Sequence, residues 1–251
     1  DGIVDLVQIQ LEKPLAPGDS INLHLNYDIK IPDDKFTRYG RDEAGNYKLR
    51  YWYMVPAPLD NGWKLYSHKD LGSHYAKPYK INVSIDIPIE FYASSSLDLL
   101  RTKTEPGYKN IRFSGEDRID SKLYLTRSFI FESIKANSTQ VITNIKDEDI
   151  KFEVKNKLLE RAFSFLNERL GEYPHKNIFI TQEDYLNSPI YGLNQLPSFI
   201  RPFPDGFQYD IKLFKTITSN YLDNTLFVNP RTEKWVTDAI LVSLMIDYVD
   251  E

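Results

Sequence analysis

Hydrophobic and polar residues alternate along much of the first 145 positions of the chain. In 21–31 every second residue is Ile, Leu or Tyr, and 81–91 repeats the pattern with Ile, Val and Phe. A period of two predicts half-buried strands, and Pro88 places the second strand at a sheet edge or at a bulge. Further strands are expected near 3–11, 48–55, 109–114 and 121–132. We therefore predict an N-terminal β-rich domain over residues 1–145.

The period becomes that of a helix after a polar, acidic linker at 144–149. Apolar residues from Val154 to Leu170 fall on one helical face, and Gly171 is placed to end that helix. A strand is expected at 177–181 and two more helices at 210–223 and 231–249. On the last helix, the residues predicted to face the core are Trp235, Ile240, Leu241, Leu244 and Tyr248. Residues 150–251 are therefore predicted to form a second domain of mixed α and β structure.

Composition narrows the class of protein. The 251 residues include 41% hydrophobic residues, with 14 Phe, 17 Tyr and 3 Trp, which is enough for a globular core. A net charge of −5 gives no sign of nucleic-acid binding. There is no Cys for disulfides or thiolate sites, and no apolar run of the length of a membrane span.

The source and compartment stay open at this stage. The chain begins without Met and ends on a helical pattern, so we expect it to be a piece of a longer protein. Few Gly and Ala with abundant Lys, Asn, Ile and Tyr favour a bacterial source, with the cell envelope or periplasm as one option for the compartment.

The most specific pattern lies between Lys215 and Asp238. The five residues 215–219, Lys-Thr-Ile-Thr-Ser, are separated by eighteen residues from Asp238, which lies in the segment Trp-Val-Thr-Asp-Ala at 235–239. Tyr221 comes two residues after Ser219, and Asn-Pro-Arg at 229–231 precedes the Trp. In spacing and flanks this segment resembles the zinc-binding part of the aminopeptidase N family of gluzincin metallopeptidases. That family holds zinc with His-Glu-x-x-His on one helix and Glu on the next.

Other segments extend this resemblance over most of 150–251. Leu-Gly-Glu-Tyr-Pro at 170–174 matches a family motif that ends a helix and leads into a strand. Tyr-Gly-Leu-Asn-Gln at 191–195 matches the family's Gly-x-Met-Glu-Asn segment, whose Glu binds the free amine of the substrate. The resemblance implies a saddle-like N-terminal β-sandwich followed by the first part of a thermolysin-like catalytic domain.

The residues at the functional positions differ from those of the family. The resemblance places Lys215 and Ser219 at the first two zinc ligands, Thr216 at the general base and Asp238 at the third ligand. An ammonium repels a metal cation, a Ser hydroxyl binds zinc weakly, and Thr has no proton affinity suited to general-base work near neutral pH. Asn194 stands where the amine-binding Glu is expected, and an amide carries no charge to pair with an ammonium.

The sequence therefore favours a non-catalytic, aminopeptidase-like protein that binds a peptide or another protein without a cofactor. The candidate binding residues are Gly192, Leu193, Asn194 and Gln195. One alternative is an active zinc metallo-aminopeptidase whose working site lies outside this chain or in a different alignment. Another is a structural β module with no peptidase ancestry, in which the last two helices do not meet near Lys215 and Asp238.

Two smaller expectations concern charged and metal-binding side chains. Lys215 and Asp238 are predicted to form a salt bridge in place of the metal, with Ser219 or Thr216 donating a hydrogen bond. His68 and His74 offer a two-His metal site, although a pair of loop His is more often simply exposed. Glu183 and Asp184 are predicted to be a solvated pair in a loop.

Overall fold

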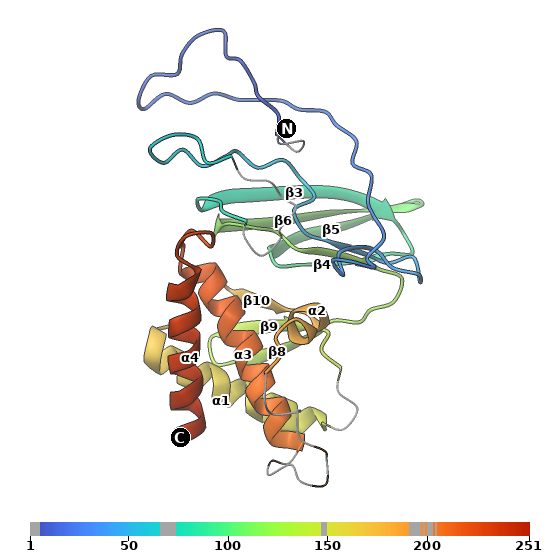
Figure 1. The fold of residues 1–251 in the computed structure, drawn as a ribbon. Helices are drawn as coiled ribbons and strands as arrows, with labels where there is room; N and C mark the ends of the chain where they lie inside the picture. The colour runs from blue at the N-terminus through green and yellow to red at the C-terminus, as the bar shows by residue number, and fades with distance from the viewer. Residues whose placement is uncertain are drawn as a thin grey trace.

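In the described residues nine strands precede the first helix, and one more strand follows it. The computed structural model describes residues 6–65, 74–146, 150–190, 197, 199, 203 and 205–251. The strands are β1 Gly40–Arg41, β2 Tyr47–Leu49, β3 Tyr79–Pro88, β4 Tyr92–Ser95, β5 Asp98–Glu105, β6 Tyr108–Arg118, β7 Leu123–Thr126, β8 Glu132–Ala136, β9 Thr139–Thr143 and β10 Asn177–Ile180. The helices are α1 Phe152–Leu170, α2 Gln182–Leu186, α3 Asp205–Thr225 and α4 Lys234–Asp250. Figure 1 shows the β-rich and helical parts stacked one above the other.

Two antiparallel sheets form the β-rich part. One has the order β1-β2-β7-β4, and the other has the order β3-β6-β5. Alternate residues of these strands point into one shared core, because successive side chains of a strand lie on opposite faces. That core is made of Leu49, Ile81, Ile87, Phe91, Leu97, Ile111, Phe113 and Leu123.

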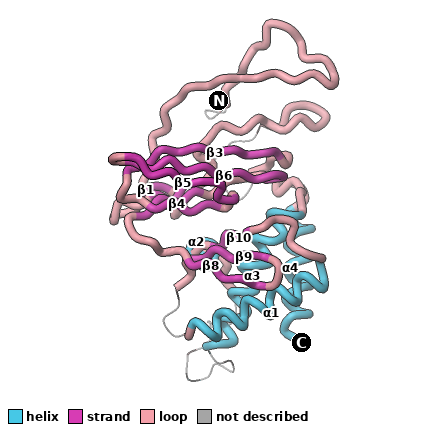
Figure 2. The backbone as a smooth tube through the Cα atoms, turned by 180° about the vertical axis from the view of Figure 1, so that it is seen from behind, coloured by secondary structure: helices cyan, strands magenta, loops and turns pink. Residues whose placement is uncertain are grey.

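The third sheet belongs with the helices. It has the order β8-β9-β10, in which β9 and β10 are parallel, and Figure 2 shows it beside the helical layer. Val141, Ile178 and Ile180 of this sheet share a core with Phe163 of α1 and Phe214 of α3. β8 and β9 thus precede the boundary expected at 145–150 but pack with the elements that follow it.

One small aromatic cluster connects the β-rich part to this third sheet. Tyr124 of β7 contacts the rings of Phe131 and Phe179, with ring centroids 5.5 and 5.6 Å away. All three side chains are buried. The cluster holds the end of β7 against β10, next to the polar contacts described below.

The β predictions are partly right. The strand predicted at 81–91 is confirmed as far as Pro88, where β3 ends, and 89–91 lead through a turn into β4. Among the described strands β3 lies at the edge of its sheet, as Pro88 indicated. The strand predicted at 21–31 is wrong: this segment has no regular structure, and its six alternating apolar side chains are 37–51% exposed. Alternation specifies which face a strand buries, but a strand also needs a neighbouring backbone to pair with, and the described residues provide none there.

The helical predictions hold better. α1 ends at Gly171, whose φ of +90° is a conformation that glycine adopts without strain. The helices expected at 210–223 and 231–249 are α3 and α4. Leu244 and Tyr248 of α4 are buried as predicted, whereas Trp235 is 70% exposed, so its placement on the core side is wrong. None of the described helices is long and apolar enough to cross a lipid bilayer.

Candidate functional site

Helix α3 carries three of the eight predicted site residues, Lys215, Thr216 and Ser219, and lies in the middle of the helical part. It packs against α1, α2, α4 and β10. Its apolar side chains, including Leu213, Phe214 and Ile217, are buried in the core. Lys215 and Ser219 lie on a half-buried face of this helix, whereas Thr216 is buried with the apolar side chains.

Lys215 is tied to the backbone instead of to Asp238. Its Nζ donates a hydrogen bond to the carbonyl of Pro189 at 2.6 Å. Burial lowers the pKa of Lys215, and the negative charge of Asp238 partly opposes that shift. The two residues are thus near enough for electrostatic attraction, but Lys215 makes its hydrogen bond elsewhere and no ion pair joins them. The predicted salt bridge is wrong, because the carbonyl of Pro189 is the partner that the ammonium reaches.

The other two positions on α3 differ in their surroundings. Thr216 is fully buried, and its hydroxyl donates to the carbonyl of Lys212 one turn earlier at 2.7 Å. Ser219 is half-buried, one turn after Lys215. Asp238 of α4 is exposed to solvent. The geometry thus keeps Lys215 and Ser219 on one face of α3, as the four-residue spacing requires.

These residues do not fit a zinc ion. Zinc needs three donor side chains that have lone pairs free for the metal, with a fourth position for water. The protonated amine of Lys215 has no free lone pair, and the hydroxyl of Ser219 is a weak ligand. The carboxylate of Asp238 alone does not make a site. In the ranges that the structure describes, no group of three His, Asp or Glu side chains is placed to hold a metal.

The candidate binding segment Gly192, Leu193, Asn194 and Gln195 lies outside the described residues, as does His68. The described part of the chain that precedes the segment 192–195 ends at residue 190. Since Lys215 binds the carbonyl of Pro189, the chain entering this segment is held against α3.

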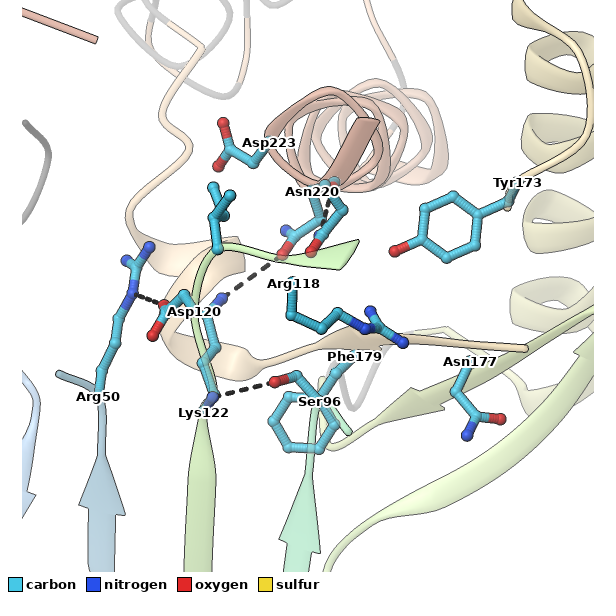
Figure 3. A pocket seen from close by; sticks show the side chains of 12 residues that line it. Arg50, Ser96, Arg118, Asp120, Lys122, Tyr173, Asn177, Phe179, Asn220 and Asp223 are labelled. Carbon is cyan, nitrogen blue, oxygen red and sulfur yellow. Dashed lines mark hydrogen bonds and ion pairs between the residues drawn. The ribbon is translucent and has the colours of Figure 1, made fainter. Parts of the chain in front are cut away.

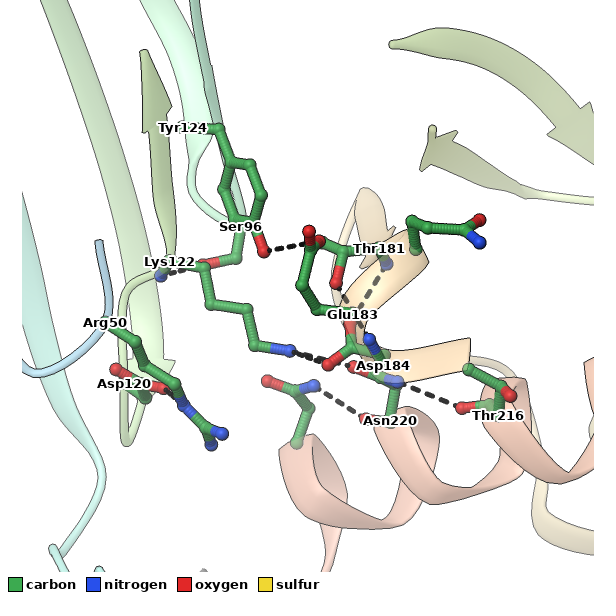
Figure 4. A network of polar contacts seen from close by, with 12 residues as sticks. Arg50, Ser96, Asp120, Lys122, Tyr124, Thr181, Glu183, Asp184, Thr216 and Asn220 are labelled. Atoms are coloured by element: carbon green, nitrogen blue, oxygen red, sulfur yellow. Dashed lines mark hydrogen bonds and ion pairs between the residues drawn. The ribbon is translucent and has the colours of Figure 1, made fainter. Parts of the chain in front are cut away.

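A second polar site, which the sequence did not reveal, lies where the β-rich part meets α2 and α3 (Figure 4). Lys122 is its central residue and is only 9% exposed. Its Nζ is 2.7 Å from Asp184 Oδ1 and 3.4 Å from Asn220 Oδ1. We call the set Lys48, Lys122, Tyr124, Glu183, Asp184 and Asn220 the junction cluster.

The junction cluster holds both of its carboxylates in pairs. Lys48 of β2 lies 2.9 Å from Glu183, and the Tyr124 hydroxyl donates to the same carboxylate at 3.0 Å. Burial alone raises the pKa of Asp184, but Lys122 outweighs that effect and holds the pKa below its usual value. Burial alone likewise lowers the pKa of Lys122, and Asp184 reverses the shift. Both partners are therefore charged at neutral pH.

The local sequence explains how α2 presents these acids. Thr181 caps the helix by accepting from the Asp184 backbone N–H, and the Asp184 carboxylate accepts from the Thr181 N–H. This capping box fixes the first turn and aims Glu183 and Asp184 at the β-rich part. The prediction of a solvated loop pair is wrong for both residues. The signal was present, since Thr-Gln-Glu-Asp at 181–184 has the spacing of a capping box.

Next to the junction cluster is a cavity of about 40 Å³ with polar walls (Figure 3). Arg50 pairs with Asp120 at 2.6 Å on one side of it. Asp223 of α3 also lines it, and burial raises the pKa of this carboxyl group. Arg118, Tyr173 and Asn177 line the cavity as well.

Comparison with known proteins gives matches of structure only. No protein-family model matches the chain, and no curated protein sequence matches it. The M1 zinc metallopeptidase from Deinococcus radiodurans is similar at 11% identity and a TM-score of 0.44, over 69% of this chain and 41% of that chain. A mutant of it bound to a Tyr-Ser-Ala substrate gives 12% identity and a TM-score of 0.49, over 83% and 47%.

A two-domain M1 zinc metallopeptidase mutant bound to L-tryptophan gives 13% identity and a TM-score of 0.49, over 90% of this chain and 50% of that chain. The chain thus spans half or less of the length of these structures. The likeness is one of fold at low identity, and it says nothing of what this chain binds.

Proposed function

We propose that this chain is a non-catalytic relative of the aminopeptidase N family that binds a peptide or another protein. In this proposal 1–145 is the saddle-like β domain and 150–251 is the first part of a thermolysin-like domain. The observation that supports it best is the hydrogen bond from Lys215 to the Pro189 carbonyl. In this proposal Lys215 stands at the position of the first metal ligand, and its ammonium group donates to a backbone carbonyl instead of binding a metal.

The same hydrogen bond supports a retained binding segment. Pro189 lies two residues before Tyr191, where the family-like segment begins. Lys215 therefore ties the approach to Gly192, Leu193, Asn194 and Gln195 to the helix that carries zinc in the family. A peptide bound along this segment would meet the amide of Asn194 where the family places a carboxylate.

The first experiment measures zinc per chain and hydrolysis of aminoacyl reporters, with and without a chelator. We expect no stoichiometric zinc and no chelator-sensitive hydrolysis, because an ammonium and a hydroxyl replace the two imidazoles. One tightly held zinc with chelator-sensitive hydrolysis would contradict the proposal and favour the active metallo-aminopeptidase.

A restoring variant tests whether the positions themselves are right. Lys215→His, Ser219→His and Asp238→Glu together place three ligands at the spacing that the family uses. We expect this variant to bind about one zinc per chain where the unmodified chain binds none. If the variant folds but binds no zinc, the side chains at 215, 219 and 238 do not lie close enough together on α3 and α4 to bind one metal ion.

Peptide binding is tested with a pair of ligands that differ only at the N-terminus. If 192–195 binds peptides, Asn194→Glu should add a preference for a free N-terminal amine over its acetylated form, because a carboxylate pairs with an ammonium. The unmodified chain should bind both forms with similar affinity. Peptide binding that Asn194→Glu leaves unchanged for both forms would place the binding site elsewhere.

A further inference from the structure

Two arginines stand directly opposite one another on the outer face of the sheet β3-β6-β5, whose strands lie side by side in Figure 2. Arg101 of β5 is the register partner of Arg112 of β6, and both side chains are exposed. Residues paired in this way have Cβ atoms roughly 5 Å apart, and like charges at such positions repel. Neither guanidinium has a hydrogen-bond or ion-pair partner in the described parts of the chain. The two positive charges are therefore close together and uncompensated.

An irregularity in β5 produces this pairing. The register of β5 against β6 shifts between Leu99 and Arg101, which makes Leu100 an extra residue of the strand. In a regular register Leu100 would stand opposite Arg112, and Arg101 would turn toward the core. Bulges redirect side chains in this way and are common next to functional sites. The bulge therefore sets Arg101 on the outer face of the sheet, beside Arg112.

The acids on this face of the sheet are engaged by other side chains. No carboxylate among the described residues lies within ion-pair distance of Arg101 or Arg112. Each acid contacts a donor elsewhere: Asp86 contacts Asn110, Asp98 contacts Asn177, Glu105 contacts Lys103 and Glu116 contacts Lys80. The face thus provides donors for its acids but no acceptor for its two arginines.

Ser84 adds a neutral donor next to the two cations. It is the register partner of Arg112 on β3, so Arg112 lies between Ser84 and Arg101. The Ser84 hydroxyl accepts a hydrogen bond from Asn110 Nδ2 at 3.4 Å, which leaves its own proton free to donate. Side chains at opposite positions of neighbouring strands share one face of the sheet. The three groups therefore form a row across the exposed face.

We propose that Arg101, Arg112 and Ser84 bind a phosphate group in its dianionic form. Two guanidinium groups supply two positive charges, and their planar N–H donors suit the oxygens of a phosphate. A single carboxylate would neutralise only one of the two charges. The phosphate is either free or carried by a phosphorylated peptide. The site does not depend on the function proposed above.

Titration with inorganic phosphate tests the site directly, at slightly alkaline pH and with sodium chloride holding the ionic strength constant. NMR of the arginine Nε–H groups should show the signals of Arg101 and Arg112 shifting together, with one Kd. Arg101→Gln and Arg112→Gln should each weaken binding about tenfold or more, because a hydrogen bond between charged groups is lost. Ser84→Ala should weaken it by less. Lys80→Gln is the matched control, because it removes a positive charge from the same face at a position paired with an acid, and it should change the Kd little.

Thermal unfolding gives a second readout that separates binding from a structural role. In chloride, Arg101→Gln should unfold at the same temperature as the unmodified chain or slightly higher, because it removes a repulsion between like charges. In phosphate, the midpoint of the unmodified chain should rise and that of Arg101→Gln should not, since only the folded site binds the anion. A midpoint of Arg101→Gln that is lowered equally in both salts would mean that the arginine serves the fold and would contradict the proposal.

A peptide that contains phosphoserine, compared with the same peptide containing serine, separates the two sources of phosphate. Tighter binding of the phosphopeptide than of inorganic phosphate would identify a phosphorylated partner, whereas an equal Kd would identify free phosphate as the ligand. Two further results would overturn the proposal. One is the absence of any shift at the Nε–H groups of Arg101 and Arg112. The other is a Kd that stays unchanged in Arg101→Gln and in Arg112→Gln, which would make the response a general effect of salt.

Discussion

Two lysines of this molecule face an aspartate from another element, and only one of them forms an ion pair. Lys122 lies 2.7 Å from Asp184, and both side chains are almost fully buried. Lys215 is attracted by Asp238 but binds the Pro189 carbonyl, and Asp238 is exposed. A buried charge must find its partner within the protein, whereas a charge near the surface has water as an alternative. Burial therefore decides which lysine forms an ion pair.

The largest effect is expected from breaking the buried pair. Lys122→Ala leaves the carboxylate of Asp184 buried without its partner and should reduce the free energy of unfolding by about 3–5 kcal/mol. Urea unfolding followed by circular dichroism measures the change. Replacing Lys122 by Met and Asp184 by Leu together should restore most of the loss, because it removes both charges. A loss below about 1 kcal/mol for Lys122→Ala would show that the pair is solvated in solution.

The pH dependence of unfolding isolates Asp184 itself. Its folded pKa is lowered from 3.8 because Lys122 outweighs burial. The folded state thus binds fewer protons than the unfolded state in this range. The stabilisation is present above pH 3.8 and is lost as the pH falls through the lower folded pKa. Asp184→Asn should reduce the free energy of unfolding at neutral pH by about 1–3 kcal/mol and flatten its decline in acid.

Urea titrations at several pH values between neutrality and the acid limit would show that flattening. Asp86→Asn is the matched control, because this acid lies on β3, away from the junction cluster. A decline in acid that is equally steep with and without Asp184 would assign it to other carboxylates.

The contrast between these sites also explains what the sequence could and could not reveal. α3 and α4 were predicted correctly because helical period is a local property of the chain. The junction cluster was not found, because Lys48, Lys122 and Glu183 lie far apart in the sequence and come together only when β2, β7 and α2 assemble. Asp184 was also missed, although its capping box is written in four consecutive residues and could have been recognised there.

The segment 21–31 shows the opposite failure. Its alternation is the clearest pattern in the chain, yet no strand forms there among the described residues. Alternation of polar and apolar residues favours an extended conformation. A strand forms only where that extended segment also pairs with another backbone. A local signal was thus sufficient for helices, whose hydrogen bonds are internal, and insufficient for a strand.

Lys215 should matter much less to stability than Lys122. Lys215→Met keeps the aliphatic part of the side chain and removes one hydrogen bond to the Pro189 carbonyl. Because this lysine is only half-buried and water can replace it, the free energy of unfolding should fall by about 1 kcal/mol or less. Urea unfolding beside Lys122→Met gives the direct comparison. An equal loss in the two variants would mean that Lys215 is as essential to the fold as the junction cluster.

The smallest effect on the free energy of unfolding is expected from a substitution at Asp238. That substitution should act mainly on the pKa of Lys215. Asp238→Asn should change the free energy of unfolding by no more than about 0.5 kcal/mol, because the side chain is exposed and has no ion pair. It should nevertheless lower the pKa of Lys215 further, since the negative charge of Asp238 opposes the lowering caused by burial. NMR titration of the Lys215 side chain measures this shift, which added salt should diminish. A Lys215 pKa that rises, or stays the same at low salt, would show that these two side chains do not interact. A clear decrease would show that α3 and α4 bring Lys215 and Asp238 close together.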